Sequence, residues 1–170
     1  MSNALSMYAL SIPVVIKALS NLAHALEKGA AHCRELGTDP SVLINARLAA
    51  DMLPLSKQVQ IASDISKGCA ARLSGAEPPA YEDTESTFDQ LQQRISRTLE
   101  YIGSVDAAKI NGAENRTVTI RMRGEPVSFT GLSYLHYFVL PNVYFHCTTA
   151  YAILRHNGVQ LGKADFLGKP

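Results

Sequence analysis

Apolar side chains recur every three or four residues along most of the chain, which is the period of an amphipathic helix. The first apolar stripe predicts a helix that begins between Ser6 and Ser11, since Pro13 is tolerated only within the first turns. We expect this helix to end near Gly37, because Asp39 and the proline after it break the pattern. The stripe consists of Tyr8, Ile12, Val15, Leu19, Leu22 and Leu26.

A second long helix is predicted from Asp51 or Met52 to Leu73, after a short helix or turn at residues 41–50. The Pro78-Pro79 pair prevents this helix from continuing. The pattern therefore resumes as a separate element further along the chain.

A third helix is predicted to begin at a cap on Asp83 or Thr84 and to end at Gly103. Its apolar positions again follow the helical period, so one face is expected to pack inward. That inner face carries Phe88, Leu91, Ile95, Leu99 and Ile102.

The pattern then changes from the helical period to strict alternation. Alternating residues over 118–129, on both sides of a turn at 123–126, predict one small β-hairpin. Thr130 is expected to cap the last helix, which runs to about His156 and is kinked or split by Pro141.

Four helices joined by short connections predict an all-α fold. We expect an antiparallel four-helix bundle with one small β-hairpin before the last helix. The chain has no interdomain linker, internal repeat or low-complexity tract, so residues 1–170 are predicted to form a single domain.

Composition narrows the classes of partner. Of 170 residues, 46% are hydrophobic and 18% charged, which predicts a folded protein with an apolar core. Sixteen basic and fifteen acidic residues give a formal charge of +1, which argues against nucleic acid as a partner. No stretch resembles a signal peptide or a membrane span, and the three cysteines are far apart. These features predict a cytoplasmic protein with free thiols and no membrane partner.

Polar residues fall on helix faces that should be apolar. Gln58 lies about 60° from Leu55, within the apolar sector of the second long helix, whereas Gln60 and Asp64 fall on the opposite side. Three polar residues of the last helix fall within about 40° of the apolar Ile153. These three are Asn142, His146 and Thr149.

Two interpretations of these residues remain open. Buried polar groups must satisfy one another, a water or a ligand, because an unpaired one costs roughly 1–3 kcal/mol. One interpretation is a hydrogen-bonded core cluster, in which Asn142 satisfies a backbone carbonyl freed by Pro141. The other is a polar pocket that binds a small molecule through Gln58, Asn142, His146 and Thr149.

Known catalytic sequence patterns do not decide between a core cluster and a ligand-binding pocket. The histidines are not spaced as a zinc set, and the chain contains no nucleophile elbow and no phosphate-binding glycine loop. The sequence does not decide whether the protein is an enzyme. No cofactor is predicted, and a divalent metal remains an alternative for which His146 is the one candidate ligand.

Five stretches together resemble an uncharacterised bacterial family within the DinB/YfiT-like superfamily, a set of metalloenzyme-related proteins. They cover nearly the whole chain. They are LAADMLPL (48–55), QVQIASD (58–64), LPNVYFH (140–146), AYAILRHNGV (150–159) and GKADF (162–166).

The resemblance implies a helical bundle that is often homodimeric and cytoplasmic. In the superfamily the metal is held by one histidine of the second helix and by two histidines, four residues apart, of the last helix. These positions correspond here to Gln58, His146 and Ala150, so one of three ligands is present.

Three functions therefore stand as hypotheses. The first is a bundle without the usual metal site whose polar pocket binds a small molecule. The second is a metal- or thiol-dependent transferase or hydrolase, with Asp51 or a residue of a second chain as an added ligand. The third is a homodimeric interaction protein, with the outward-facing Tyr144 and Tyr151 in the interface.

Overall fold

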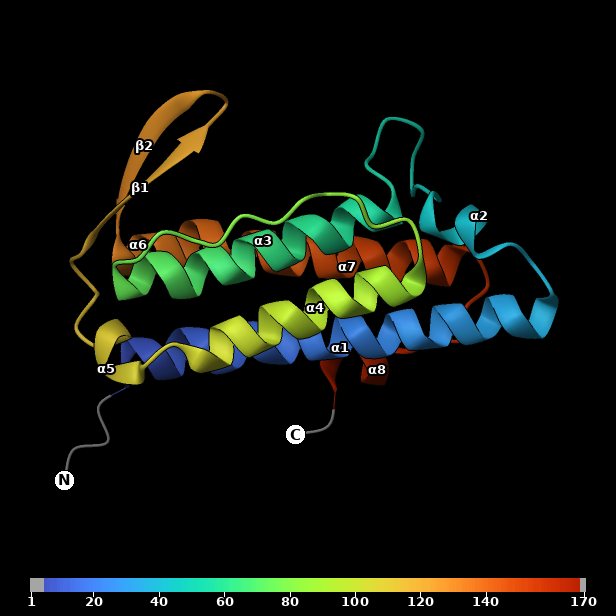
Figure 1. Ribbon diagram of the computed structural model, residues 1–170, viewed down its shortest axis with the longest axis horizontal. Coiled ribbons are helices and arrows are strands. Elements are labelled where there is room, and N and C mark those ends of the chain that lie inside the picture. The colour runs from blue at the N-terminus through green and yellow to red at the C-terminus, as the bar shows by residue number, and fades with distance from the viewer. Residues whose placement is uncertain (1–4, 169–170) are drawn as a thin grey trace.

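The computed structural model describes residues 5–168, which are mostly helical (Figure 1). Helix α1 packs against α4 and α7, and helix α3 also packs against α4 and α7. The apolar faces of these helices enclose a continuous core that includes Leu19, Val59, Leu91 and Ile153. The four long helices are α1 (Met7–Leu36), α3 (Leu55–Ser74), α4 (Phe88–Ser104) and α7 (Leu140–His156).

The predicted bounds of α1 are confirmed. The Ser6 side chain accepts a hydrogen bond from the Ala9 backbone N–H and caps the start of the helix. Gly37 ends the helix in the left-handed conformation, with φ of 65°.

The predicted starts of the next two helices are wrong. Helix α3 begins at Leu55 rather than at residue 51 or 52, because Pro54 disfavours helical geometry in the residue before it. Helix α4 is capped by Thr87 rather than by Asp83 or Thr84. Thr87 forms a reciprocal capping box with Gln90, which is a stronger signal for the start of a helix than a lone acidic residue.

The predicted antiparallel arrangement holds only in part, because α1 runs antiparallel to α3 and α4, and α7 runs antiparallel to α3 (Figure 1). Helices α3 and α4 run in the same direction, as do α1 and α7 (Figure 1). The ion pair between Asp64 and Arg94 joins the middle of α3 to the first half of α4. The extended segment 75–87, called the strap below, returns along α3 and makes the parallel arrangement reachable. At about 3.3 Å per residue the strap is longer than α3 at about 1.5 Å per residue.

Four helices do not account for the described chain, because several short elements connect the long ones. The hairpin is confirmed, and its turn places Arg123 and Gly124 at positive φ, as a two-residue hairpin turn requires. The short elements are α2 (Pro40–Ile44), α5 (Ala107–Ile110), β1 (Thr117–Met122), β2 (Glu125–Thr130), α6 (Gly131–Tyr134), a π-helical turn (Leu135–Val139) and α8 (Lys163–Leu167).

The last helical segment is interrupted near Pro141, as predicted. Thr130 caps α6, and the π-helical turn then separates α6 from α7. Pro141 lies in the first turn of α7, where its missing N–H costs least.

Helix α1 is more apolar than its packing requires. By length and composition alone it could cross a membrane, yet its buried residues pack in the protein core. Only 39% of its most apolar stretch is buried. Most of the remaining apolar residues of α1 are half-buried.

Candidate functional site

Gln58 and His146 form a direct pair between α3 and α7. The His146 ring nitrogen Nδ1 lies 2.8 Å from the Gln58 oxygen Oε1. The Gln58 amide nitrogen donates to the backbone carbonyl of Leu53 at 2.9 Å. Both side chains are buried, so each satisfies the other where water has little access.

The hydrogen bond to Gln58 also determines which ring nitrogen of His146 carries the proton. Because Gln58 Oε1 can only accept, Nδ1 of His146 carries the proton and donates. Burial lowers the pKa of His146, so the neutral ring is favoured at neutral pH.

The other two predicted site residues do not join this pair. The Asn142 amide donates to the Phe138 carbonyl at 2.6 Å, within the π-helical turn. The Thr149 hydroxyl donates to the Phe145 carbonyl at 2.8 Å. Each is satisfied within its own helical segment. Asn142 does bond a backbone carbonyl, but the acceptor is Phe138 and not Tyr137, the residue four before Pro141 whose carbonyl the proline leaves without a donor.

The residues at the superfamily's metal position do not fit a metal ion. Ala150 has no atom that could bind a metal, and the Gln58 oxygen already accepts a hydrogen bond from His146. That leaves the second ring nitrogen of His146 as one ligand, which is too few to hold a metal ion. Within residues 5–168, no group of three or more histidine, cysteine, aspartate or glutamate side chains is placed to hold a metal.

Substitution of Gln58 by alanine should lower the free energy of unfolding by about 1–3 kcal/mol, because it leaves the His146 N–H without its acceptor. The wild-type protein should also lose stability as the pH falls below about 6.5, since the unfolded histidine then binds protons that the buried one resists. Urea denaturation between pH 5 and pH 7.5 measures both effects.

The exposed Gln93 of α4 provides the matched control, and its replacement by alanine should change stability by less than about 0.5 kcal/mol. Equal effects of the two substitutions would show that the Gln58–His146 pair contributes nothing.

An apolar cavity lies elsewhere, in a groove between α1, α7 and α8 (the α1/α7 groove). It has a volume of about 450 Å³, and none of the four predicted site residues lines it. Its lining is almost wholly apolar or aromatic and includes Pro13, Val14, Ala18, Leu22, Cys147 and Phe166.

Two side chains predicted to face solvent or a partner, Tyr144 and Tyr151, line this groove. Tyr151 packs edge-on against Phe166 of α8, with ring centroids 6.0 Å apart. Tyr144 also lines the groove and is 44% exposed. Burial raises the pKa of the Cys147 thiol to about 12, so this lining residue stays uncharged.

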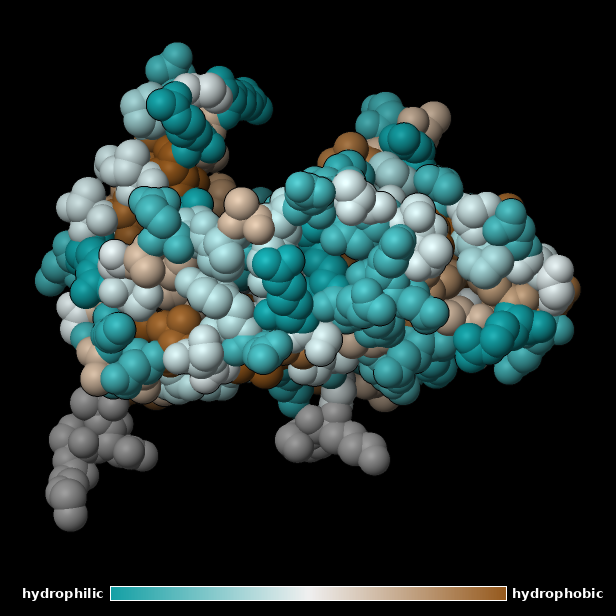
Figure 2. Space-filling view, in the orientation of Figure 1, coloured by the Kyte–Doolittle hydropathy of each residue, from teal (hydrophilic) through white to brown (hydrophobic). Residues whose placement is uncertain are grey.

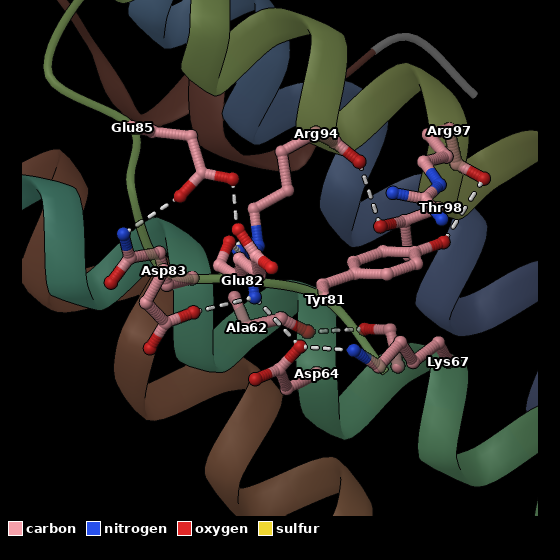
Figure 3. A network of polar contacts seen from close by, with 12 residues as sticks. Ala62, Asp64, Lys67, Tyr81, Glu82, Asp83, Glu85, Arg94, Arg97 and Thr98 are labelled. Atoms are coloured by element: carbon pink, nitrogen blue, oxygen red, sulfur yellow. Dashed lines mark hydrogen bonds and ion pairs between the residues drawn. The ribbon is translucent and has the colours of Figure 1, made fainter. Parts of the chain in front are cut away.

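A second polar cluster was not predicted from the sequence. Arg94 of α4 is almost fully buried, and its guanidinium contacts three carboxylates, those of Asp64, Asp83 and Glu85, at 2.8–3.0 Å (Figure 3). The acids come from α3 and the strap. Arg94 therefore ties the strap to two helices.

Further contacts extend this Arg94 cluster. Lys67 pairs with Asp64 at 2.6 Å and lies 3.7 Å from the ring centre of Tyr81 in the strap (Figure 3). Gln60 donates to Glu85 at 2.8 Å. The prediction that Gln60 faces outward is thus wrong, because the strap buries that face of α3. The surface seen over the strap and α4 is mostly hydrophilic (Figure 2).

The sequence did hold a signal for the Arg94 cluster. Arg94 comes three residues after Leu91 and four before Thr98, on the face assigned to the core. A charged residue there needs buried partners, and the acidic residues at 82–85 supply them.

Two matches relate the chain to known proteins, and together they confirm the resemblance to an uncharacterised DinB-like family. Residues 7–167 match a family described as Domain of unknown function (DUF1993). The crystal structure of a DinB family member protein from Shewanella denitrificans is 40% identical in sequence, with a TM-score of 0.86. That match covers 96% of this chain and 92% of the other. No curated protein matches the chain.

Proposed function

Since the chain belongs to the DUF1993 family, whose name records no function, we propose from the geometry that the protein binds a small, largely apolar molecule in the α1/α7 groove. The observation that carries this proposal is the groove itself. Its volume of about 450 Å³ falls in the range of small-molecule sites, which are concave and mostly apolar.

The composition of α1 supports the same proposal independently. Much of its most apolar stretch is not buried, although exposed apolar surface is unfavourable in water. Val14 and Ala18 are half-buried residues of α1 that line the groove. A bound apolar molecule would remove this surface from water.

The Gln58–His146 pair is assigned a structural role in this proposal. Gln58 and His146 are paired with each other, and Asn142 and Thr149 are engaged by backbone carbonyls. Such a pair sets the register between α3 and α7, as a buried polar pair can. The donor set also weighs against a metal-dependent transferase or hydrolase at this position.

Substitution of Ala18 by phenylalanine should weaken binding of the neutral fluorescent probe N-phenyl-1-naphthylamine at least tenfold, because the larger ring fills the groove. Fluorescence titration measures the affinity, and circular dichroism checks that the fold is kept. In the matched control, Ala9 at an exposed position of the same helix is replaced by phenylalanine, and binding should be unchanged. Equal probe affinity in all three proteins, or no binding to any, would refute the proposal.

A further inference from the structure

We infer that the strap is a lid, which opens independently of the helical bundle and covers a site for an anionic ligand on α3 and α4. While the strap is closed, the carboxylates of Asp83 and Glu85 occupy the place of that ligand. Neither residue lines the α1/α7 groove, so this site is separate from the one proposed above.

The strap is held by contacts of side chains rather than by deep burial or backbone pairing. No residue from 75 to 87 is fully buried, and within the described part of the chain residues 77–86 form no backbone-to-backbone hydrogen bond. Asp83 pairs with Lys57 and with Arg94, both at 3.0 Å. Glu85 contacts Arg94 at 2.9 Å and accepts from Gln60 at 2.8 Å. Segments with so few buried apolar contacts can open locally while the rest of the protein stays folded.

The face of α3 beneath the strap is polar although it is buried. Gln60 and Lys67 contact the strap, and Ser63, between them along the helix, falls within about 60° of both. All three are at most 5% exposed. Among the described residues, the Ser63 hydroxyl, the Gln60 oxygen Oε1 and the Arg94 nitrogen Nε have no hydrogen-bond partner. Because buried polar groups are normally paired, this face is better suited to a polar ligand than to a permanent cover.

The charge of the covered face favours an anion. The helices supply three cations to the cluster, Lys57, Lys67 and Arg94, and one acid, Asp64. When the strap opens, Arg94 keeps Asp64 and loses both carboxylates of the strap. A ligand with two acidic groups can take both positions, because a guanidinium binds oxyanions through more than one nitrogen.

A polar cavity lies at the edge of the strap and leads to Arg94. It has a volume of about 540 Å³ and lies between strap residues 80–85 and α4 residues 90–97. Its lining includes Tyr81, Glu85, Arg94 and Arg97. The strap therefore does not pack tightly along this side of α4, and an anion can approach Arg94 there.

The first test measures strap opening by thiol labelling. Replacement of the unpartnered Ser63 by cysteine places a thiol beneath the strap, whereas Cys69 of the same helix is fully buried in the core. Trypsin cleaves after Lys67, so the two thiols fall in separate peptides. Iodoacetamide should label position 63 about tenfold or more faster than Cys69, each rate being divided by its value in concentrated urea. Circular dichroism checks the fold, and equal rates at the two positions would overturn the inference.

A charge change in the strap should increase this opening. In the Ser63 variant, replacement of Asp83 by asparagine should raise the labelling rate at position 63 by about two- to fivefold, the range for a partly exposed ion pair. Replacement of the exposed Glu125 in the hairpin by glutamine makes the same change in net charge and should leave the rate unchanged. An Asp83 variant no faster than this control would also count against the lid.

The second test asks whether the covered face binds an anion. Replacement of Asp83 by asparagine together with Glu85 by glutamine removes both competing carboxylates of the strap. Isothermal titration calorimetry should then show malonate binding about tenfold or more tightly than to wild type, and acetate, with one carboxylate, binding more weakly than malonate. The control replaces the exposed Glu35 and Glu125 by glutamine and should keep the wild-type affinity. If the strap variant binds malonate no better than this control, the anion site is absent and the inference is overturned.

Discussion

Replacement of Arg94 by alanine should lower the free energy of unfolding by about 3–4 kcal/mol. The Arg94 guanidinium is almost fully buried and forms ion pairs with three carboxylates. Its removal leaves Asp64, Asp83 and Glu85 close together without the cation that all three contact. The strap loses its main attachment to α4 at the same time. Urea denaturation at pH 7 measures the loss.

Arg97 supplies the control for this substitution. Both arginines lie over the Tyr81 ring, Arg94 at 5.4 Å and Arg97 at 4.1 Å from its centre, but Arg97 is exposed. Its replacement by alanine should cost less than about 1 kcal/mol. A similar loss for the two arginine variants would contradict the role given to the Arg94 cluster.

The Arg94 cluster should also make the protein less stable at low pH. Desolvation by itself would raise the pKa values of Asp83 and Glu85, but hydrogen bonds and charge from Arg94, together with Lys57 for Asp83, outweigh it and lower both. A lowered pKa contributes stability above the unfolded value, near pH 4, that is lost as the pH falls further. Wild-type stability should therefore fall more steeply than that of the Arg94 variant between pH 5 and pH 3.

Replacement of Gly131 by alanine should destabilise the protein by roughly 3 kcal/mol or more, the upper range for overpacked sites. An added Cβ would overlap the backbone carbonyl oxygen of Ala113, which cannot move aside as a flexible side chain could. The Leu132 backbone N–H donates to the Glu114 carbonyl at 3.0 Å, which holds the two segments together. Thermal unfolding followed by circular dichroism measures the effect.

Gly103 provides the opposite case. It lies inside α4, and an added Cβ there would meet open space. Its replacement by alanine should stabilise the protein by about 0.5–1 kcal/mol, through helix propensity alone. A destabilised Gly103 variant, or a neutral Gly131 variant, would show that these contacts are misassigned.

The fold was predictable where local chemistry decides it. The Ser6 and Gly37 caps and the alternation at 118–129 are signals that need no knowledge of tertiary structure. Helix direction was not predictable in this way, because it depends on the path of the strap. A proline-containing connection can turn sharply or run the length of a helix, and tertiary contacts such as those of Arg94 decide which.

The site was predictable only in part. The helical period identified Gln58 and His146 as polar groups on facing helices, and they do meet. It could not show that Asn142 and Thr149 would bond within their own helical segment. The α1/α7 groove escaped notice because it is formed by surfaces that do not pack fully, and periodicity reports packed faces only.

The most direct test of the central claim, that the α1/α7 groove is the ligand site, is a crystal structure of the protein grown with N-phenyl-1-naphthylamine. We expect the probe between Ala18, Cys147 and Phe166, with the Gln58–His146 hydrogen bond unchanged. A probe bound beside His146, or a groove closed by side chains of a second copy, would contradict the claim.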